Sequence, residues 1–246
     1  MIRNAIAFVI LAITLAVLIS RIQRPRLRLS TLSSLPRGDI VIVQAFDSEY
    51  RVGAVSAEHN RAWAQKNGYK YFLYSTLHFQ EQPHFMKYHA LLKAFEIPGV
   101  EGAVYVDGDA IINYNGSRPV FDHAADITFG NEFWWTVAWP NTGYIAARRT
   151  PQTTAFLRAV LSSAECAECR RTKCGWLGHR DQGCIDRLLR CKRYRVRAAV
   201  AMVQTAPQRL ARKNKRAFLT HWVGTKDHGR IVREIGEYRR FWGLPV

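Results

Sequence analysis

Short apolar runs rich in β-branched and aromatic residues alternate with segments whose apolar residues recur at helical spacing. In the first half of the chain, strand-like runs and helical segments follow one another in the order 39–46, 54–67, 69–75, 86–96 and 102–112. Strands that alternate with helices predict an α/β fold in which helices flank a mostly parallel sheet.

The alternation continues toward the C-terminus. Strand-like runs are found at 126–130, 136–148, 195–203 and 217–223, and helical segments at 153–161 and 182–190. A chain of 246 residues can bury a sizeable core, and this one has no internal repeat or low-complexity block. We therefore interpret residues 39–246 as a single domain.

The N-terminal region has a different character. Residues 4–20 are apolar and uncharged, and these seventeen residues would extend about 25 Å as a helix, which is at the short end of what spans a bilayer. We predict a short tail at 1–3, a transmembrane signal-anchor at 4–20 and a basic, Ser- and Pro-containing stem or linker at 21–38. A cleavable signal peptide is the alternative, although no small-x-small cleavage site follows.

The chain is strongly basic. It has 36 Lys and Arg residues against 19 Asp and Glu, a formal net charge of +17, and residues 187–246 alone carry 16 basic and 3 acidic side chains. Such a field attracts polyanions, namely nucleic acid, anionic lipid or phosphorylated small molecules. A basic solvated surface without a specific partner is the other interpretation.

Two carboxylates, Asp107 and Asp109, follow an apolar run in the stretch AVYVDGDAII. An Asp-Gly pair favours a turn, which would explain one of them. Two converging carboxylates repel one another unless a cation lies between them, and Mg²⁺ and Mn²⁺ take oxygen ligands. Ligands of open α/β sheets bind at the carboxyl ends of strands, so the alternatives here are a turn and a divalent metal site.

Five sequence blocks between about residues 41 and 224 resemble those of one family, in that family's order. They read HNRAWAQKNGYKYFLYS, FMKYHALLKAF with GAVYVDGDAII, NTGYIAARRTPQTTAFLRAV, RDQGCIDRLL and FLTHWVG. The family is that of the galactosyl/xylosyltransferases, which includes plant xyloglucan xylosyltransferases and fungal α-galactosyl- and α-mannosyltransferases. The chain departs from the family at Phe85, where the family has Trp, and at Thr225, where it has Cys.

The resemblance implies a GT-A fold and a retaining glycosyltransferase. Its partners would be a nucleotide-sugar donor (UDP-galactose, UDP-xylose or GDP-mannose) and a glycan acceptor. Asp107, Asp109 and, by resemblance, His221 would bind Mn²⁺, or Mg²⁺ in its place, which stabilises a diphosphate leaving group as a Lewis acid. A satisfied histidine in an apolar strand is the alternative for His221.

The same resemblance implies further site residues. The donor-binding candidates are Lys87, Asp107, Asp109, Asn141, Thr142, Gly143, Gly224 and Lys226, and the catalytic candidates are Asp181 and Gln182. Lys87 and Lys226 would contact phosphate, unless they are ordinary exposed lysines. Gly143 would let the backbone approach the ligand closely. Asp181 would orient hydroxyl groups of donor or acceptor, or serve only as a helix N-cap.

Five cysteines cluster in one short segment, at Cys166, Cys169, Cys174, Cys184 and Cys191. In a secretory lumen they would form two disulfides and leave one thiol. The C-x2-C-x4-C spacing with His179 nearby is typical of a zinc knuckle, which is the second interpretation. Free thiols are the third.

The sequence carries conflicting signals about the cellular compartment in which the domain lies. The family implies a single-pass type II protein of the Golgi membrane with a luminal catalytic domain, and Asn115 begins an N-G-S glycosylation sequon that is usable only in that lumen. The arginines after the apolar span, however, would place the domain in the cytosol by the positive-inside rule. These are Arg21, Arg24, Arg26 and Arg28.

Two other functions compete with the glycosyltransferase. A membrane-tethered nucleic-acid-binding protein would use the positive charge and stack bases on Trp134, Trp135, Trp176 and Trp242. It leaves the paired aspartates unexplained, so no nucleic-acid partner is expected. An inactive partner subunit of a transferase complex is disfavoured because Asp107, Asp109 and His221 are all present.

Overall fold

The computed structural model describes residues 32–33, 36–76, 83–114, 118–119, 121–122, 124–131, 140–171, 180–191, 194–201, 204–205, 218–222 and 225–244. None of the helices within these ranges is long and apolar enough to cross a membrane. The predicted signal-anchor at 4–20, most of the stem, the sequon at Asn115 and the candidate Gly224 lie outside the described residues.

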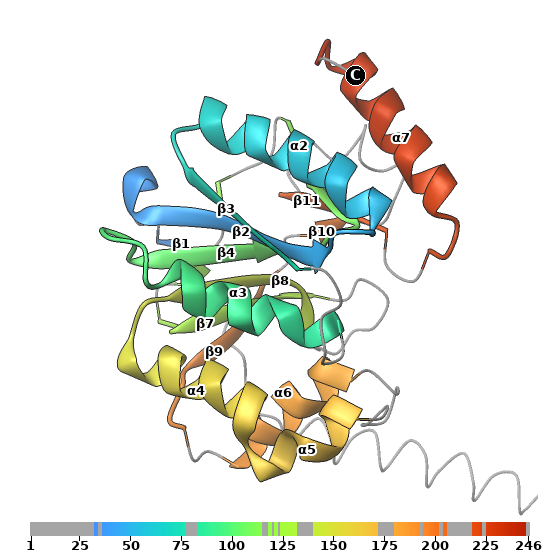
Figure 1. Ribbon diagram of the computed structural model, residues 1–246. Helices are drawn as coiled ribbons and strands as arrows, with labels where there is room; N and C mark the ends of the chain where they lie inside the picture. Colours follow the sequence, from blue (N-terminus) through green and yellow to red (C-terminus); the bar gives the residue numbers. More distant parts are fainter. Residues whose placement is uncertain are drawn as a thin grey trace, which may run out of the picture.

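A six-stranded sheet forms the centre of the fold, in the order β3–β2–β4–β8–β7–β9 (Figure 1). Its strands are β2 (Ile40–Asp47), β3 (Lys70–Thr76), β4 (Gly102–Val106), β7 (Ile127–Asn131), β8 (Pro140–Arg148) and β9 (Ala198–Ala201). Only β8 within this sheet runs antiparallel to its neighbours. The predicted α/β fold with a mostly parallel sheet is confirmed.

Helices cover both faces of this sheet, with α2 on one face and α3, α4 and α6 on the other (Figure 1). The helices are α2 (Arg51–Lys66), α3 (Met86–Ala94), α4 (Pro151–Ser162), α5 (Ala164–Arg171), α6 (Arg180–Cys191) and α7 (His228–Phe241). Side chains of a strand point alternately to its two faces. In β2, Ile42 therefore packs in one core with Trp63 of α2, whereas Val43 packs in another with Leu91 of α3.

The strand predicted at 102–112 is two strands in two sheets. β4 ends at Val106, and β5 (Ala110–Ile112) joins a smaller sheet in the order β10–β11–β5. The other short elements are β1 (Leu32–Ser33), β6 (Phe121–Asp122), β10 (Gln204–Thr205), β11 (Leu219–His221) and the 3-10 turns η1 (Arg37–Asp39) and η2 (Pro83–Phe85). The three residues between β4 and β5 leave the central sheet and form the turn that carries both aspartates.

Two helices, α5 and α7, are not predicted from the sequence. In α7, Ile231, Ile235 and Tyr238 have helical spacing and are buried in a small core with Val52 of α2. Polar residues outnumber them in the segment, and this concealed the pattern. The same core contains Trp222, which follows β11, so α7 packs next to the strand that carries His221.

A disulfide links two of the helices on the α3 side of the sheet. Cys166 of α5 is bonded to Cys184 of α6, and Cys169 is disulfide-bonded as well. The predicted disulfide bonding is confirmed for these cysteines, and a zinc site that uses the thiolate of Cys166 or Cys184 is excluded. Cys174 and His179 lie outside the described residues.

Candidate active site

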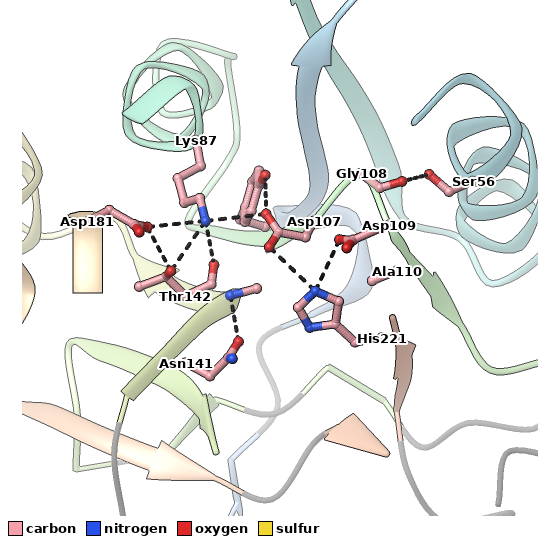
Figure 2. Close-up of polar contacts among 12 residues, drawn as sticks. Ser56, Lys87, Asp107, Gly108, Asp109, Ala110, Asn141, Thr142, Asp181 and His221 are labelled. Carbon is pink, nitrogen blue, oxygen red and sulfur yellow. Dashed lines mark hydrogen bonds and ion pairs between the residues drawn. The ribbon is translucent and has the colours of Figure 1, made fainter. Parts of the chain in front are cut away.

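The two aspartates after β4 lie beside a histidine from a distant part of the chain. Asp107 and Asp109 belong to the β4–β5 turn, and His221 is the last residue of β11. Antiparallel pairing of β11 with β5 places His221 opposite Ala110. The Nε2 atom of His221 lies 3.1 Å from Oδ1 of Asp109 and 3.6 Å from Oδ2 of Asp107 (Figure 2).

These three side chains have the donor set of a divalent metal site. Among the described residues they offer one ligand atom each, and the three atoms lie within 4.8 Å of one another. Burial lowers the pKa of His221, but the carboxylates of Asp109 and Asp107 outweigh burial and raise it. The carboxylates thus favour positive charge between them. Two carboxylate oxygens and an imidazole nitrogen fit a cation such as Mn²⁺.

Lys87, near the start of α3, lies between two carboxylates in the interior. Its Nζ is 3.3 Å from Oδ1 of Asp107 and 3.2 Å from Oδ2 of Asp181. It also donates to the carbonyl oxygen and the hydroxyl of Thr142, at 3.2 and 3.3 Å. Burial lowers the pKa of Lys87, but Asp107 and Asp181 raise it above its usual value, so the lysine carries its charge here. The interpretation of Lys87 as an exposed helix lysine is wrong.

Asp181 lies within the first turn of α6, and not at an N-cap. Its Oδ2 accepts hydrogen bonds from Thr142 Oγ1 at 2.7 Å and from Tyr88 OH at 3.1 Å, in addition to the ion pair with Lys87. Gln182 is also buried, and its Oε1 has no hydrogen-bond partner among the described residues. The structure therefore connects Asp181 to Asp107 through the single ammonium of Lys87.

The N-T-G block lies on β8, next to the metal ligands. Asn141 accepts the backbone N–H of Gly143 through Oδ1 at 2.8 Å, and Thr142 faces Lys87 and Asp181 (Figure 2). A Cβ atom on Gly143 would overlap Cε1 and Nδ1 of His221. Gly143 was expected to permit close approach to a ligand; in the structure, the group that approaches it closely is the imidazole of His221.

One donor-binding candidate lies apart from this group. Lys226 is exposed on the segment between β11 and α7, and its ammonium has no hydrogen bond or ion pair with the described residues. Its contact with phosphate stays a prediction, as does any role of Gly224.

Two tyrosines of the site were not predicted. Tyr105 donates to Oδ1 of Asp107 at 2.7 Å, and Tyr88 donates to Asp181. Burial, together with the neighbouring carboxylates, raises the pKa of both tyrosines well above the usual range, so both remain protonated donors. Tyr105 lies two residues before Asp107, and the alternation of side chains along a strand is the signal that places them on one face.

No protein-family model matches the sequence, and no curated protein matches it. Solved structures match in fold. A glycosyltransferase involved in the glycosylation of the major capsid of PBCV-1 aligns with a TM-score of 0.59 at 14% identity, over 80% of this chain and 98% of that one. The glycosyltransferase GlyE of Streptococcus pneumoniae TIGR4 aligns with a TM-score of 0.50 at 11% identity, over 85% and 65%. The chain shares the fold of these glycosyltransferases.

The likeness is consistent with the galactosyl/xylosyltransferase resemblance of the sequence blocks and with the GT-A-like fold that it implies. At 14% and 11% sequence identity, the similarity to these structures shows a shared fold and nothing more specific. The assignment of an activity therefore rests on the site itself.

Proposed function

We propose that the protein is a metal-dependent glycosyltransferase that moves a sugar from a nucleotide-sugar donor to a glycan acceptor. One observation carries the proposal. Two carboxylates and an imidazole converge at the carboxyl end of a parallel strand, where α/β folds bind ligands, with a charged lysine buried beside them. The fold, which known glycosyltransferases share, supports this interpretation.

The donor set fits Mn²⁺. Asp107, Asp109 and His221 would hold the ion, and an imidazole ligand favours a transition metal over Mg²⁺, which takes oxygen ligands. Bound there, a divalent cation supplies Lewis-acid stabilisation of a diphosphate leaving group. Tyr105 keeps Oδ1 of Asp107 hydrogen-bonded, so that Oδ2 is the oxygen that faces His221.

The remaining residues would bind and orient the two sugars. Lys87 provides a second positive charge next to the metal ligands, where phosphate oxygens of a donor would lie. The side-chain amide oxygen of Gln182, Oε1, is buried without a hydrogen-bond partner among the described residues, and a sugar hydroxyl would donate to it. Asp181, fixed by Thr142 and Lys87, would accept from a neighbouring hydroxyl.

The finer assignments rest on the sequence resemblance. We propose a retaining reaction, with UDP-galactose, UDP-xylose or GDP-mannose as the donor. We also propose a luminal catalytic domain held at the Golgi membrane by residues 4–20. The disulfide between Cys166 and Cys184 supports an oxidising compartment.

The experiment measures donor hydrolysis and sugar transfer by the full chain with Mn²⁺, across a panel of nucleotide sugars. Asp109→Asn and His221→Ala should each lower turnover about 10²- to 10³-fold, the usual cost of removing one electrostatic stabiliser of a transition state. Asp186→Asn is the matched control, because that carboxylate pairs with Arg190 on α6 and lies outside the cluster. Normal activity of folded Asp109→Asn, or activity unaffected by EDTA, would reject the proposal.

A further inference from the structure

Within the described residues, the turn that carries the two aspartates is held by bonds from neighbouring strands only at its ends, where the N–H of Asp107 donates to the carbonyl oxygen of Gly143 at 3.0 Å and the carbonyl oxygen of Asp109 accepts from Trp222. β4 ends at Val106 and β5 begins at Ala110, so the residues between them lie outside both sheets. Buried backbone carbonyls must nevertheless find hydrogen-bond donors. Backbone N–H groups supply part of this need, since Ala110 donates to the carbonyl oxygen of Asp107 at 3.1 Å. Three polar side chains on β2 and α2, none of which belongs to the metal-ligand set, supply further donors.

Ser56 and Gln44 donate hydrogen bonds to the carbonyl oxygens of the first half of the turn. Ser56 Oγ lies 2.6 Å from the carbonyl oxygen of Gly108, to which it donates. Gln44 Nε2 donates to the carbonyl oxygen of Asp107 at 3.2 Å and to Ser56 Oγ at 3.3 Å. Tyr71 OH donates to Gln44 Oε1 at 2.8 Å. This last bond orients the Gln44 amide so that its NH₂ group points toward the turn.

Asn60 binds the second half. Its Nδ2 donates to the carbonyl oxygen of Ala110 at 3.0 Å, and its Oδ1 accepts from the backbone N–H of Ile112 at 2.7 Å. The carbonyl of Asp109 accepts from the backbone N–H of Trp222 at 3.1 Å. Every carbonyl from Asp107 to Ala110 is therefore hydrogen-bonded, and three of the four receive a bond from a side chain of β2 or α2.

We infer that Gln44, Ser56 and Asn60, which we call the support triad, are positioning residues for metal binding. The inference rests on the proposed function. All three are fully buried, and burying a polar group is costly unless it is hydrogen-bonded. Their bonds satisfy that requirement and fix the backbone from which Asp107 and Asp109 project. A fixed backbone keeps the two carboxylates close together before the cation binds, despite their mutual repulsion.

The support triad acts on the ion through the backbone of its ligands. Loss of a group that orients a metal ligand commonly costs about 10- to 100-fold in metal affinity. We expect Ser56→Ala to weaken Mn²⁺ binding by about tenfold or more, since it removes the shortest bond to the turn. Tyr71→Phe should weaken it by less than Ser56→Ala does, because Gln44 then loses only its orienting donor.

The test is a Mn²⁺ titration of the full chain in detergent, with free Mn²⁺ followed by electron paramagnetic resonance and no donor sugar present. Thr153→Val is the matched control. Thr153 is as fully buried as Ser56, and its hydroxyl lies 2.9 Å from that of Thr150 and 3.3 Å from the carbonyl oxygen of Asp126, neither of which belongs to the turn or to the support triad. Thermal unfolding of each variant separates a general loss of stability from a loss of affinity.

The outcomes distinguish this inference from the proposed function. If the wild type binds Mn²⁺ and Asp109→Asn does not, the metal site stands; a Ser56→Ala affinity equal to that of Thr153→Val then overturns the support triad alone. If the wild type does not bind Mn²⁺, both fail. If Ser56→Ala does not fold, Tyr71→Phe decides, and an unchanged affinity in that variant overturns the inference.

Discussion

Gly143 of β8 is where a single added carbon should disturb the metal site. Its Cβ would overlap the imidazole of His221 most severely, and it would also lie 2.9 Å from Oδ1 of Asn141. The backbone there lies outside the left-handed region that favours glycine, so alanine meets no conformational strain, only the clash. The backbone also has little freedom to retreat, because the carbonyl oxygen of Gly143 accepts from the N–H of Asp107 at 3.0 Å and its own N–H bonds to Asn141. Gly143→Ala must therefore displace His221.

The size of the effect follows from that clash. Overpacking a well-packed interior costs about 1–3 kcal/mol. If the imidazole moves aside to relieve it, the same free energy must be spent to bring His221 back to the cation. At about 1.4 kcal/mol per factor of ten, we expect Gly143→Ala to weaken Mn²⁺ binding by about 5- to 150-fold. The free energy of unfolding should fall by less than about 1–3 kcal/mol, since the displaced ring has relieved the clash.

A double-mutant cycle provides the assay. Mn²⁺ affinity is measured for the wild type, Gly143→Ala, His221→Ala and the double variant. In the His221→Ala background there is no ring to displace, so adding Gly143→Ala should change the affinity little. An equal loss in both backgrounds, or wild-type affinity in the single Gly143→Ala variant, would refute the reasoning.

Two further predictions concern stability. Cys184→Ser, which removes the bond to Cys166, should lower the free energy of unfolding by about 3 kcal/mol in chemical denaturation; equal stability of the variant and the oxidised wild type would contradict this. Burial lowers the pKa of the His59 side chain to about 4. The unfolded chain therefore takes up a proton at higher pH than the folded one, so about 3 kcal/mol of the free energy of unfolding is present above pH 6.5 and is lost as the pH falls toward 4. His59→Gln should flatten this part of the stability profile, and parallel profiles would argue against it.

Elements with strong apolar periodicity could be predicted from the sequence. β2, β3, α2 and α3 lie within a few residues of their predicted positions because each buries a regular stripe or face against the sheet. α7 was missed because only three of its apolar side chains mark the buried face. The prediction of one strand at 102–112 was wrong because apolar runs stand on both sides of the two aspartates and read as one segment, whereas the chain turns between them into another sheet.

The residues of the candidate site also fall into two groups, those that the sequence indicates and those that only the tertiary structure brings together. Asp107 and Asp109 could be singled out because they lie one residue apart after an apolar run, where converging carboxylates repel one another unless a cation lies between them. Ser56 and Asn60 could not, since polar residues on a helix give no sign of which carbonyl they bind, and their partners lie 52 and 50 residues away. The placement of Lys87 between two carboxylates depends in the same way on Asp181, which is brought to it by tertiary packing.

The position of His221 depends on a short ladder. β11 and β5 pair antiparallel over three residues, and the bonds that close the ladder lie at both ends. At one end the N–H of Asn113 donates to the carbonyl of Phe218 at 2.8 Å, and at the other the N–H of Trp222 donates to the carbonyl of Asp109 at 3.1 Å.

This register decides whether the site has its third ligand. A slip of one residue would turn every side chain of β11 to the opposite face and put Thr220 where His221 now lies. The hydroxyl of Thr220 opposes such a slip, because it donates to Oδ1 of Asn113 at 2.7 Å on the other face. The bond from Trp222 ends on Asp109 itself, so the turn that supplies two ligands also holds the strand that supplies the third. The metal site and the β5–β11 pairing should therefore be lost together.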